Sequence, residues 1–235
     1  PVAPRWLGVH LLLHAALGGF GFLLFLRLLG RSPEAALAGA LAFSFSGFAL
    51  SCTAFLNSAT TLAWVPWLLA SVAAARLDGR RALRLALLGS AASGALLAHA
   101  GEPALGLVGI LLALAVALFG SGGTRLRALG ALLGGGALAF LASAPYLFDV
   151  LRATEASARR LRGFSWTEFS AVGFHPLRLL ETPFPFLFGD PSRVLSGAYW
   201  GFAASQGNPP YLASLSFGVL PLALAGAFAL CPRRR

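Results

Sequence analysis

Side chains that could act chemically on a polar substrate are few in this sequence of 235 residues. It holds eight Asp or Glu and four His, and all 18 of its basic residues are Arg. A carboxylate or an imidazole can move a proton, and the planar Arg fork matches the oxygens of a phosphate. The residues that we select as candidates for substrate binding are His99, Glu102, Arg159, Arg160, Glu181, Asp190, Tyr199 and Trp200.

Three of these residues have a structural as well as a functional interpretation. Glu102 precedes a proline, so it can be an acid in the first turn of a helix, where the helix dipole favours it. It can also be a carboxylate at the membrane surface that binds a sugar hydroxyl or a basic group. Arg159 and Arg160 can lie on a solvated face, contact anionic lipid headgroups or cradle a phosphate.

Aromatic side chains concentrate in the segment 183–210, which is also rich in Pro and Gly. This composition predicts an ordered loop on the surface, since flexible linkers are rich in Gly and Ser and seldom so aromatic. Tyr199 and Trp200 can anchor such a loop at the membrane interface, or they can stack on sugar rings. The sequence leaves both roles open.

His10 and His14 are spaced by about one helical turn in the first apolar stretch. Two such imidazoles could share a metal ion, but the sequence places no third ligand near them, and Cys52 and Cys231 form no zinc-binding pattern. Polar residues within a membrane span usually face the bundle interior, which is the interpretation that we favour. We therefore predict no metal site and no cofactor, with a divalent metal ion as the open alternative.

The composition determines the class of protein that must position these residues. The chain is 57% hydrophobic and 11% charged, whereas a soluble domain has about 25% charged residues. This excludes an ordinary cytosolic globule, and it excludes intrinsic disorder, which requires low hydrophobicity. The net charge of +10 comes from arginines that lie in short clusters between apolar segments, so we interpret them as topology signals and predict no nucleic-acid partner.

Seven apolar segments are long enough to serve as membrane-spanning helices. Residues 35–75 carry no charge and are too many for one crossing, so we predict a helical hairpin with its break in Cys52–Thr61. Pro66 is expected to interrupt the third span. The predicted spans are 6–29, 35–53, 60–76, 83–99, 104–120, 127–150 and 211–231.

The predicted fold class is an all-α, polytopic transmembrane helical bundle of about seven spans. Residues 1–151 form six spans, 152–210 form a long extracytoplasmic loop with short helices, and 211–235 form the last span and a basic tail. Arginines occupy alternate connections and the tail, which places these parts in the cytoplasm by the positive-inside rule and the long loop outside.

Four groups of short motifs follow one another along the chain. They are Ser44–Phe48 with Trp64–Leu68, His99–Pro103, Ser143–Leu147 leading into Ser157–Arg159, and Asn208–Tyr211 followed by Pro221. In this order they resemble the motifs of the YfhO-type family of bacterial polytopic membrane proteins, which is grouped with the GT-C-fold glycosyltransferases. Glu102 departs from the family's turn motif, which usually resembles Gly-His-Pro, and this leaves the role of that position open.

The resemblance implies a location in the bacterial cytoplasmic (inner) membrane and the transfer of a sugar from a polyprenyl-phosphate donor. The acceptor would be a glycopolymer or glycolipid of the cell envelope. Arg159, with Arg160 as second choice, would contact the donor phosphate, and the loop 152–210 would cover the site.

The resemblance also implies a catalytic carboxylate in a first outer loop, which would lie upstream of Pro1. Because the sequence holds no methionine, we expect it to be part of a longer chain and to be inactive alone. The alternative functions are a transporter or flippase of lipid-linked saccharides and a non-catalytic subunit of envelope assembly.

Overall fold

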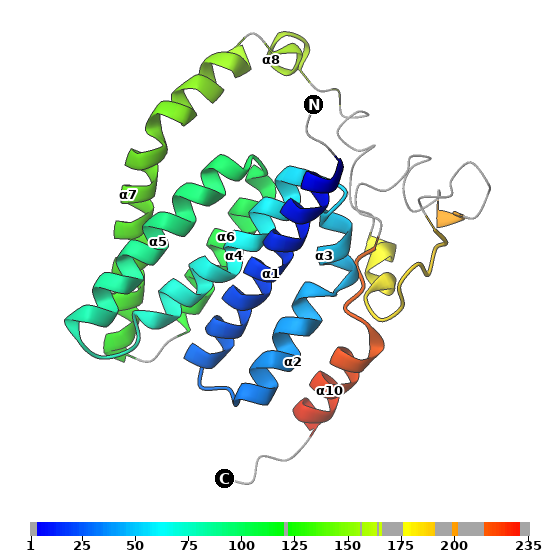
Figure 1. Ribbon diagram of the computed structural model, residues 1–235, viewed down its shortest axis with the longest axis horizontal. Coiled ribbons are helices and arrows are strands. Elements are labelled where there is room, and N and C mark those ends of the chain that lie inside the picture. The colour runs from blue at the N-terminus through cyan, green and yellow to red at the C-terminus, as the bar shows by residue number, and fades with distance from the viewer. Residues whose placement is uncertain are drawn as a thin grey trace. The chain divides into compact units, whose positions relative to one another are not determined.

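The computed structural model describes residues 4–119, 122–155, 157–163, 165, 176–190, 199–201 and 214–230. Within these residues the regular structure is helical, apart from an isolated antiparallel bridge between Gly189 and Tyr199 (Figure 1). The all-α class is confirmed. The elements are α1 (Pro4–Leu28), α2 (Pro33–Ser44), α3 (Gly47–Cys52), α4 (Leu56–Ala74), α5 (Arg80–Ala100), α6 (Pro103–Leu118), α7 (Gly122–Glu155), α8 (Ala158–Arg162), the 3₁₀ helix η1 (Pro176–Glu181) and α10 (Val219–Leu230).

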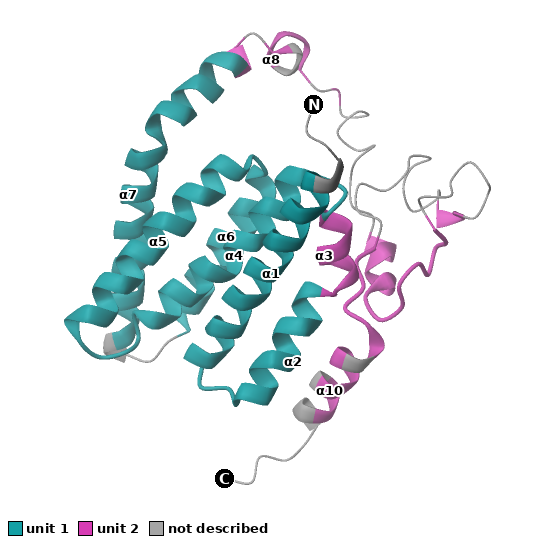
Figure 2. Ribbon diagram, in the orientation of Figure 1, with its two compact units in different colours: residues 1–44, 53–153 teal, residues 45–52, 154–235 magenta. Residues whose placement is uncertain are grey.

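The chain divides into two compact units, which Figure 2 shows in different colours. Unit 1 comprises residues 1–44 and 53–153, and unit 2 comprises residues 45–52 and 154–235. Unit 1 therefore holds α1, α2, α4, α5, α6 and nearly all of α7. The predicted motif Asn208–Tyr211 lies outside the described residues.

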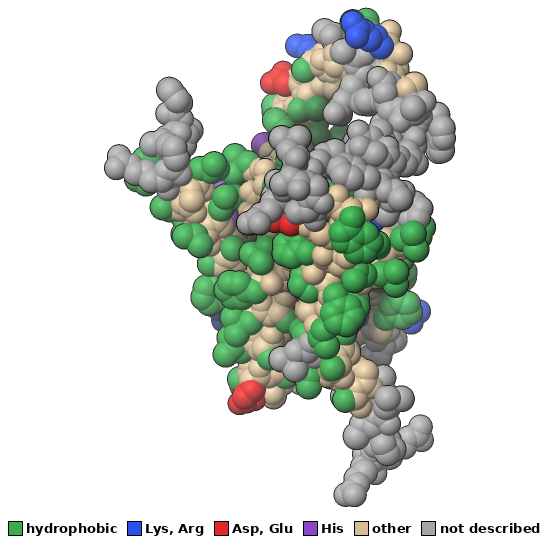
Figure 3. Space-filling view, turned by 90° about the vertical axis from the view of Figure 1, so that its right-hand side faces the viewer, with side chains coloured by type: hydrophobic (Ala, Val, Ile, Leu, Met, Phe, Trp, Pro, Cys, Tyr) green, Lys and Arg blue, Asp and Glu red, His purple; other side chains and the backbone are tan. Residues whose placement is uncertain are grey.

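Three helices of unit 1 are long and apolar enough to cross a membrane, namely Trp6–Leu28, Arg80–Ala100 and Thr124–Glu155. Their large side chains are turned outward, as Leu12 at 72% exposure and Leu133 at 69% illustrate. Hydrophobic side chains cover much of the described surface in Figure 3. Large apolar patches of this kind are unfavourable in water and stable against lipid hydrocarbon, so these helices indicate a membrane protein.

Small side chains pack the interior of unit 1. Most of its buried core positions are alanines, and α4 lies at the centre, packed against α1, α5 and α6. Glycines let the backbones approach: a Cβ on Gly135 of α7 would lie 2.5 Å from the Cβ of Ser90 on α5. Interfaces of small residues are typical of membrane helices, because close van der Waals contact replaces the hydrophobic effect there.

The helices of unit 1 alternate in direction. α1 and α4 run parallel, since His10 contacts Thr60 and the indole N–H of Trp67 donates to the Leu17 carbonyl at 2.9 Å. Figure 1 shows α6 running the same way as these two, and α2, α5 and α7 running the opposite way. The connections therefore gather at two ends, which we call the arginine end and the Glu102 end. The arginine end carries Arg27, Arg31, Arg76, Arg80, Arg81, Arg84, Arg125 and Arg127.

The predicted second span, 35–53, is not one continuous helix. α2 ends at Ser44 and α3 begins at Gly47. The Ser46 hydroxyl accepts a hydrogen bond from the Ala49 N–H at 3.1 Å, which caps α3, and the Gly47 N–H donates to the Ser216 carbonyl at 2.7 Å instead of continuing α2. The predicted hairpin break is present, because α3 ends at Cys52 and α4 begins at Leu56.

Two further helices differ from the sequence prediction. α4 continues through Pro66, whose ring lies against Gly21 of α1, where the missing side chain leaves room for it. α10 begins only at Val219, and residues 214–218 are not helical, so the helix is shorter than the predicted span 211–231.

Candidate functional site

Glu102 lies just before α6, with its carboxylate against the first turn of α4. Its Oε2 accepts a hydrogen bond from Asn57 Nδ2 at 2.9 Å and one from Ser58 Oγ at 3.4 Å. Gly101 ends α5 with a φ of 80°, a left-handed conformation that suits glycine, and Pro103 starts α6. These two donors are neutral, and the N–H groups in the first turn of α4, which have no partner within the helix, favour a negative charge nearby. The half-exposed carboxylate can accept a hydrogen bond from a substrate hydroxyl.

His99 is exposed in the last turn of α5, three residues before Glu102. Its Nδ1 lies 2.8 Å from the Ala95 carbonyl and 3.5 Å from the Ser143 hydroxyl of α7. A carbonyl can only accept, so Nδ1 carries the proton and Nε2 is the acceptor of the neutral ring. The Tyr146 ring stacks on the imidazole with 4.6 Å between centroids. The site thus holds a fixed imidazole with one nitrogen able to accept from a ligand.

The histidines of α1 lie at the same end of unit 1. His10 Nε2 lies 3.4 Å from Thr60 Oγ1, and His14 Nδ1 lies 2.9 Å from the His10 carbonyl. The two rings are 4.0 Å apart. In the described part of the chain, no group of three or more His, Cys, Asp or Glu side chains could hold a metal ion.

An apolar groove of about 450 Å³ runs between α4, α5, α6 and α7. It reaches Ala98 and Leu147, the neighbours of His99 and Tyr146 in the sequence. The hydroxyl of Ser90 is buried in its wall and has no hydrogen-bond partner among the described residues. The lining residues are Leu68, Ser90, Gly94, Ala98, Ile110, Leu114, Leu132, Leu133, Gly136, Ala139, Phe140 and Leu147. A groove without a charged lining residue suits a hydrocarbon chain.

The candidate arginines that the sequence indicated lie in unit 2, in α8. The Arg160 guanidinium is 61% exposed and forms an ion pair of 3.3 Å with Glu155, and this pair is worth little because solvent screens it. Arg159 occupies the preceding position of the same short helix.

The other candidates of unit 2 have different surroundings. Glu181 is almost completely buried in η1 and pairs with Arg178 at 2.7 Å. Tyr199 is buried and its hydroxyl donates to the Gly201 carbonyl at 3.2 Å. Trp200 is 64% exposed and packs edge-on against Phe188, so its ring remains open to a ligand or a membrane interface. Asp190 is half-buried.

No protein-family model matches the chain, and no curated protein and no solved structure is detectably similar to it. The resemblance to the YfhO-type family therefore rests on the sequence motifs alone.

Four residues of the Glu102 end were not selected as candidates from sequence. Asn57 and Ser58 fell in the polar stretch that we interpreted as a turn, although their contact with Glu102 spans about 45 residues. Ser143 and Tyr146 belong to a quoted motif, but their partner His99 is 44 residues away from Ser143. Their one sequence signal was the presence of polar groups near the end of an apolar segment.

Proposed function

We propose that this chain is part of a membrane-embedded glycosyltransferase, which moves a sugar from a polyprenyl-phosphate donor to an extracytoplasmic acceptor of the cell envelope. In this proposal about seven segments cross the membrane. The arginine end and the C-terminal tail face the cytoplasm by the positive-inside rule, and the Glu102 end and the segment 152–210 face outward.

One observation carries the proposal: the polar side chains of the Glu102 end lie where the apolar groove ends. Ala98 of α5 and Leu147 of α7 line the groove. Their direct neighbours in the sequence are His99 and Tyr146, respectively. A lipid-linked sugar has the same two parts, a hydrocarbon chain and a polar head. The donor chain would lie in the groove, and its head would meet Glu102 and His99.

Glu102 has a definite role in this arrangement. Its carboxylate, oriented by Asn57 and Ser58, accepts a hydrogen bond from a hydroxyl of the donor sugar or the acceptor. Hydrogen bonds to a charged group are worth about 1.5–3 kcal/mol, so this contact would fix the sugar's orientation. His99 Nε2 can accept from a second hydroxyl.

The donor phosphate requires a cation, because charge builds up on it as the bond to the sugar breaks. Arg159 is our candidate for this contact, as a guanidinium can bind two phosphate oxygens. Arg160 is the second choice, since its ion pair with Glu155 is exposed and easily exchanged.

The test is a mass spectrum of envelope glycopolymers and glycolipids from a strain that lacks the gene. Reintroduction of the natural protein should restore a missing sugar, and Arg159→Ala should insert normally but fail to restore it. Arg84→Ala, at the exposed arginine end of α5, is the matched control and should restore the sugar. Restoration by Arg159→Ala would remove this residue from the mechanism.

A transporter or flippase of lipid-linked saccharides is the second candidate, and the break between α2 and α3 favours it. α2 has 12 residues and rises about 18 Å, less than the ~30 Å of a bilayer core. A break at that depth is typical of transporters, whose discontinuous helices form the substrate site. An unchanged set of envelope sugars, together with accumulated lipid-linked saccharides in the deletion strain, would favour this function over transfer.

A further inference from the structure

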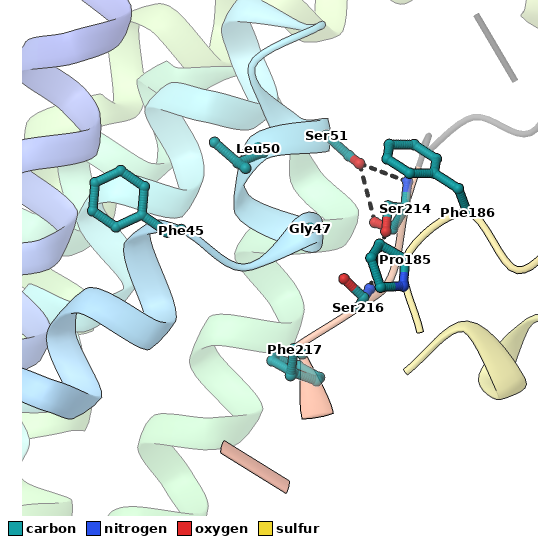
Figure 4. Close-up of a pocket in the computed structure, with 10 residues that line it drawn as sticks. Phe45, Gly47, Leu50, Ser51, Pro185, Phe186, Ser214, Ser216 and Phe217 are labelled. Atoms are coloured by element: carbon teal, nitrogen blue, oxygen red, sulfur yellow. Dashed lines mark hydrogen bonds between the residues drawn. The ribbon is translucent and has the colours of Figure 1, made fainter. Parts of the chain in front are cut away.

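Unit 2 contains a cavity of about 460 Å³ at the point where α2 gives way to α3 (Figure 4). Three segments line it: residues 45–51 around the helix break, Pro185 with Phe186, and the extended stretch 214–218. All of its described lining side chains are uncharged.

Hydrogen bonds between two of these segments build the wall of the cavity. The Gly47 N–H donates to the Ser216 carbonyl at 2.7 Å. The Ser51 hydroxyl donates to the Ser214 carbonyl at 3.0 Å and accepts from the Ser214 N–H at 2.7 Å, as the dashed lines in Figure 4 show. Non-helical backbone in an otherwise apolar chain is stable only where such partners satisfy it.

Gly47 brings two serine hydroxyls close to the backbone of the break. A Cβ at this position would lie 2.5 Å from Ser214 Oγ and 2.7 Å from Ser216 Oγ, so a larger residue would force both hydroxyls to move. Ser214 Oγ accepts from the Ser216 N–H at 3.2 Å and still has its own proton to donate. Within the described residues the Ser216 hydroxyl forms no hydrogen bond, which leaves it able to donate and to accept.

Three phenyl rings line the same cavity and are half or more exposed. Phe45 is 70%, Phe186 50% and Phe217 51% exposed. Phe186 also has a φ of 57°, a left-handed conformation that is costly for an aromatic residue. Strained backbone of this kind concentrates at binding sites, where the surrounding structure holds a side chain in a required position.

We propose that this cavity binds one uncharged saccharide unit. A phosphate or carboxylate would need a cation, and an amine would need an anion, and no described lining residue supplies either. A hydrocarbon chain would leave the Ser216 hydroxyl and the proton of the Ser214 hydroxyl without a partner. A neutral sugar ring presents hydroxyls to the serines and C–H groups to the phenyl rings. That the bound saccharide is the sugar which the protein transfers rests on the proposed function. That the cavity binds a saccharide does not depend on it.

Saturation-transfer NMR on the detergent-solubilised protein tests the proposal without any need for turnover. The probes are the methyl glycosides of glucose, galactose, mannose and N-acetylglucosamine, with methyl glucuronide as the charged analogue. We expect saturable binding of at least one neutral glycoside and at least tenfold weaker binding of the glucuronide. Ser216→Ala should weaken the neutral glycoside about fivefold, the effect of one lost hydrogen bond.

Gly47→Ala should weaken binding further, because its methyl group displaces both hydroxyls. Ser71→Ala and Gly130→Ala are the controls: the Ser71 hydroxyl bonds a carbonyl of its own helix, and a Cβ on Gly130 meets nothing within 4 Å. If Gly47→Ala fails to fold, Ser216→Ala decides the question.

Absence of saturable binding by all four neutral glycosides would overturn the proposal. So would equal binding of the glucuronide, or unchanged binding by Ser216→Ala. Failure of the glycosyltransferase proposal is a separate result, because it would appear as an unchanged envelope sugar while these binding data stand.

Discussion

The two ends of unit 1 are made by the same helices but use their polar side chains differently. At the arginine end, the Arg76 guanidinium donates to the Val116 carbonyl of α6, and Arg127 bridges Asp78 and the Gly79 carbonyl. These contacts satisfy carbonyl and carboxylate oxygens at the end of α6 and in the turn before α5. At the Glu102 end, a carboxylate and an imidazole are oriented by Asn57, Ser58, Ser143 and Tyr146.

The difference distinguishes charged side chains that stabilise the fold from polar side chains that are able to bind a ligand. Guanidinium groups beside helix C-termini complete the hydrogen bonding of exposed carbonyls and compensate the helix dipole. The Glu102 end instead presents hydrogen-bond acceptors on Glu102 and on His99 Nε2. Hydrogen bonds to neighbouring residues orient both side chains. Variants in each end should therefore separate stability from function.

The largest effect on stability is expected where α5 and α7 meet. In Gly135→Ala the new Cβ would lie 2.5 Å from Ser90 Cβ and 3.0 Å from the Leu87 carbonyl, and overpacking of this kind costs about 1–3 kcal/mol. Gly136→Ala is the matched control, because its Cβ meets nothing within 4 Å. Thermal unfolding in detergent should show a lowered midpoint for Gly135→Ala alone. Equal midpoints would mean that the two helices do not pack at Gly135.

Arg76→Ala should destabilise the arginine end and leave function intact. Loss of a charged donor from the Val116 carbonyl costs about 1.5 kcal/mol, since the carbonyl then depends on other partners. The measurement pairs the unfolding midpoint with restoration of the envelope sugar in the deletion strain. Loss of the sugar in a folded Arg76→Ala protein would contradict the division between the two ends.

Filling the groove should reduce transfer by about tenfold, which corresponds to about 1.4 kcal/mol. Gly136 lines the groove and has open space around it, so Gly136→Phe can occupy the volume that the proposed donor chain would need. Gly130→Phe, on the same helix and also with open space, lies outside this groove and serves as the control. The measurement is the initial rate of sugar transfer in membranes that contain either variant. Equal rates for Gly136→Phe and Gly130→Phe would argue against a donor chain in the groove.

The smallest effect concerns Glu34, at the start of α2 beside the arginine end. Its own backbone N–H and the Ser32 hydroxyl hold the pKa of this carboxyl below its usual value of 4.5. A lowered pKa in the folded state stabilises the fold above pH 4.5, and this contribution disappears as the pH falls through the folded pKa. Below pH 4.5 the unfolding midpoint of Glu34→Gln should therefore fall less than that of the natural protein, and parallel curves would contradict this.

The sequence predicted the helical class and several of the turns, because charge and hydropathy are local properties. Arginine-rich turns and the motif around Gly101 and Pro103 mark chain reversals, and the structure has α5 ending and α6 beginning there. The break at Ser46 escaped prediction, since an uninterrupted apolar run gives no sign that the Gly47 N–H bonds to a carbonyl 169 positions later.

The candidate site was predictable only in part, and for the same reason. Glu102 and His99 are conspicuous as polar residues between two apolar segments. Asn57 and Ser58 become part of the site through the parallel packing of α4 and α6, which no periodicity in the sequence specifies. The ion pair between Arg178 and Glu181 could have been predicted from the sequence, because a spacing of three places both side chains on one side of a helical turn.

The central claim is that the Glu102 end handles the sugar and the arginine end does not. Two carboxylate variants in the deletion strain compare the ends directly: Glu102→Gln and Asp78→Asn, the latter at the ion pair with Arg127. We predict that Glu102→Gln lowers the rate of sugar incorporation about 10- to 100-fold, the effect of a lost charged hydrogen bond, while Asp78→Asn keeps it. Full incorporation by a folded, membrane-inserted Glu102→Gln protein would contradict the account.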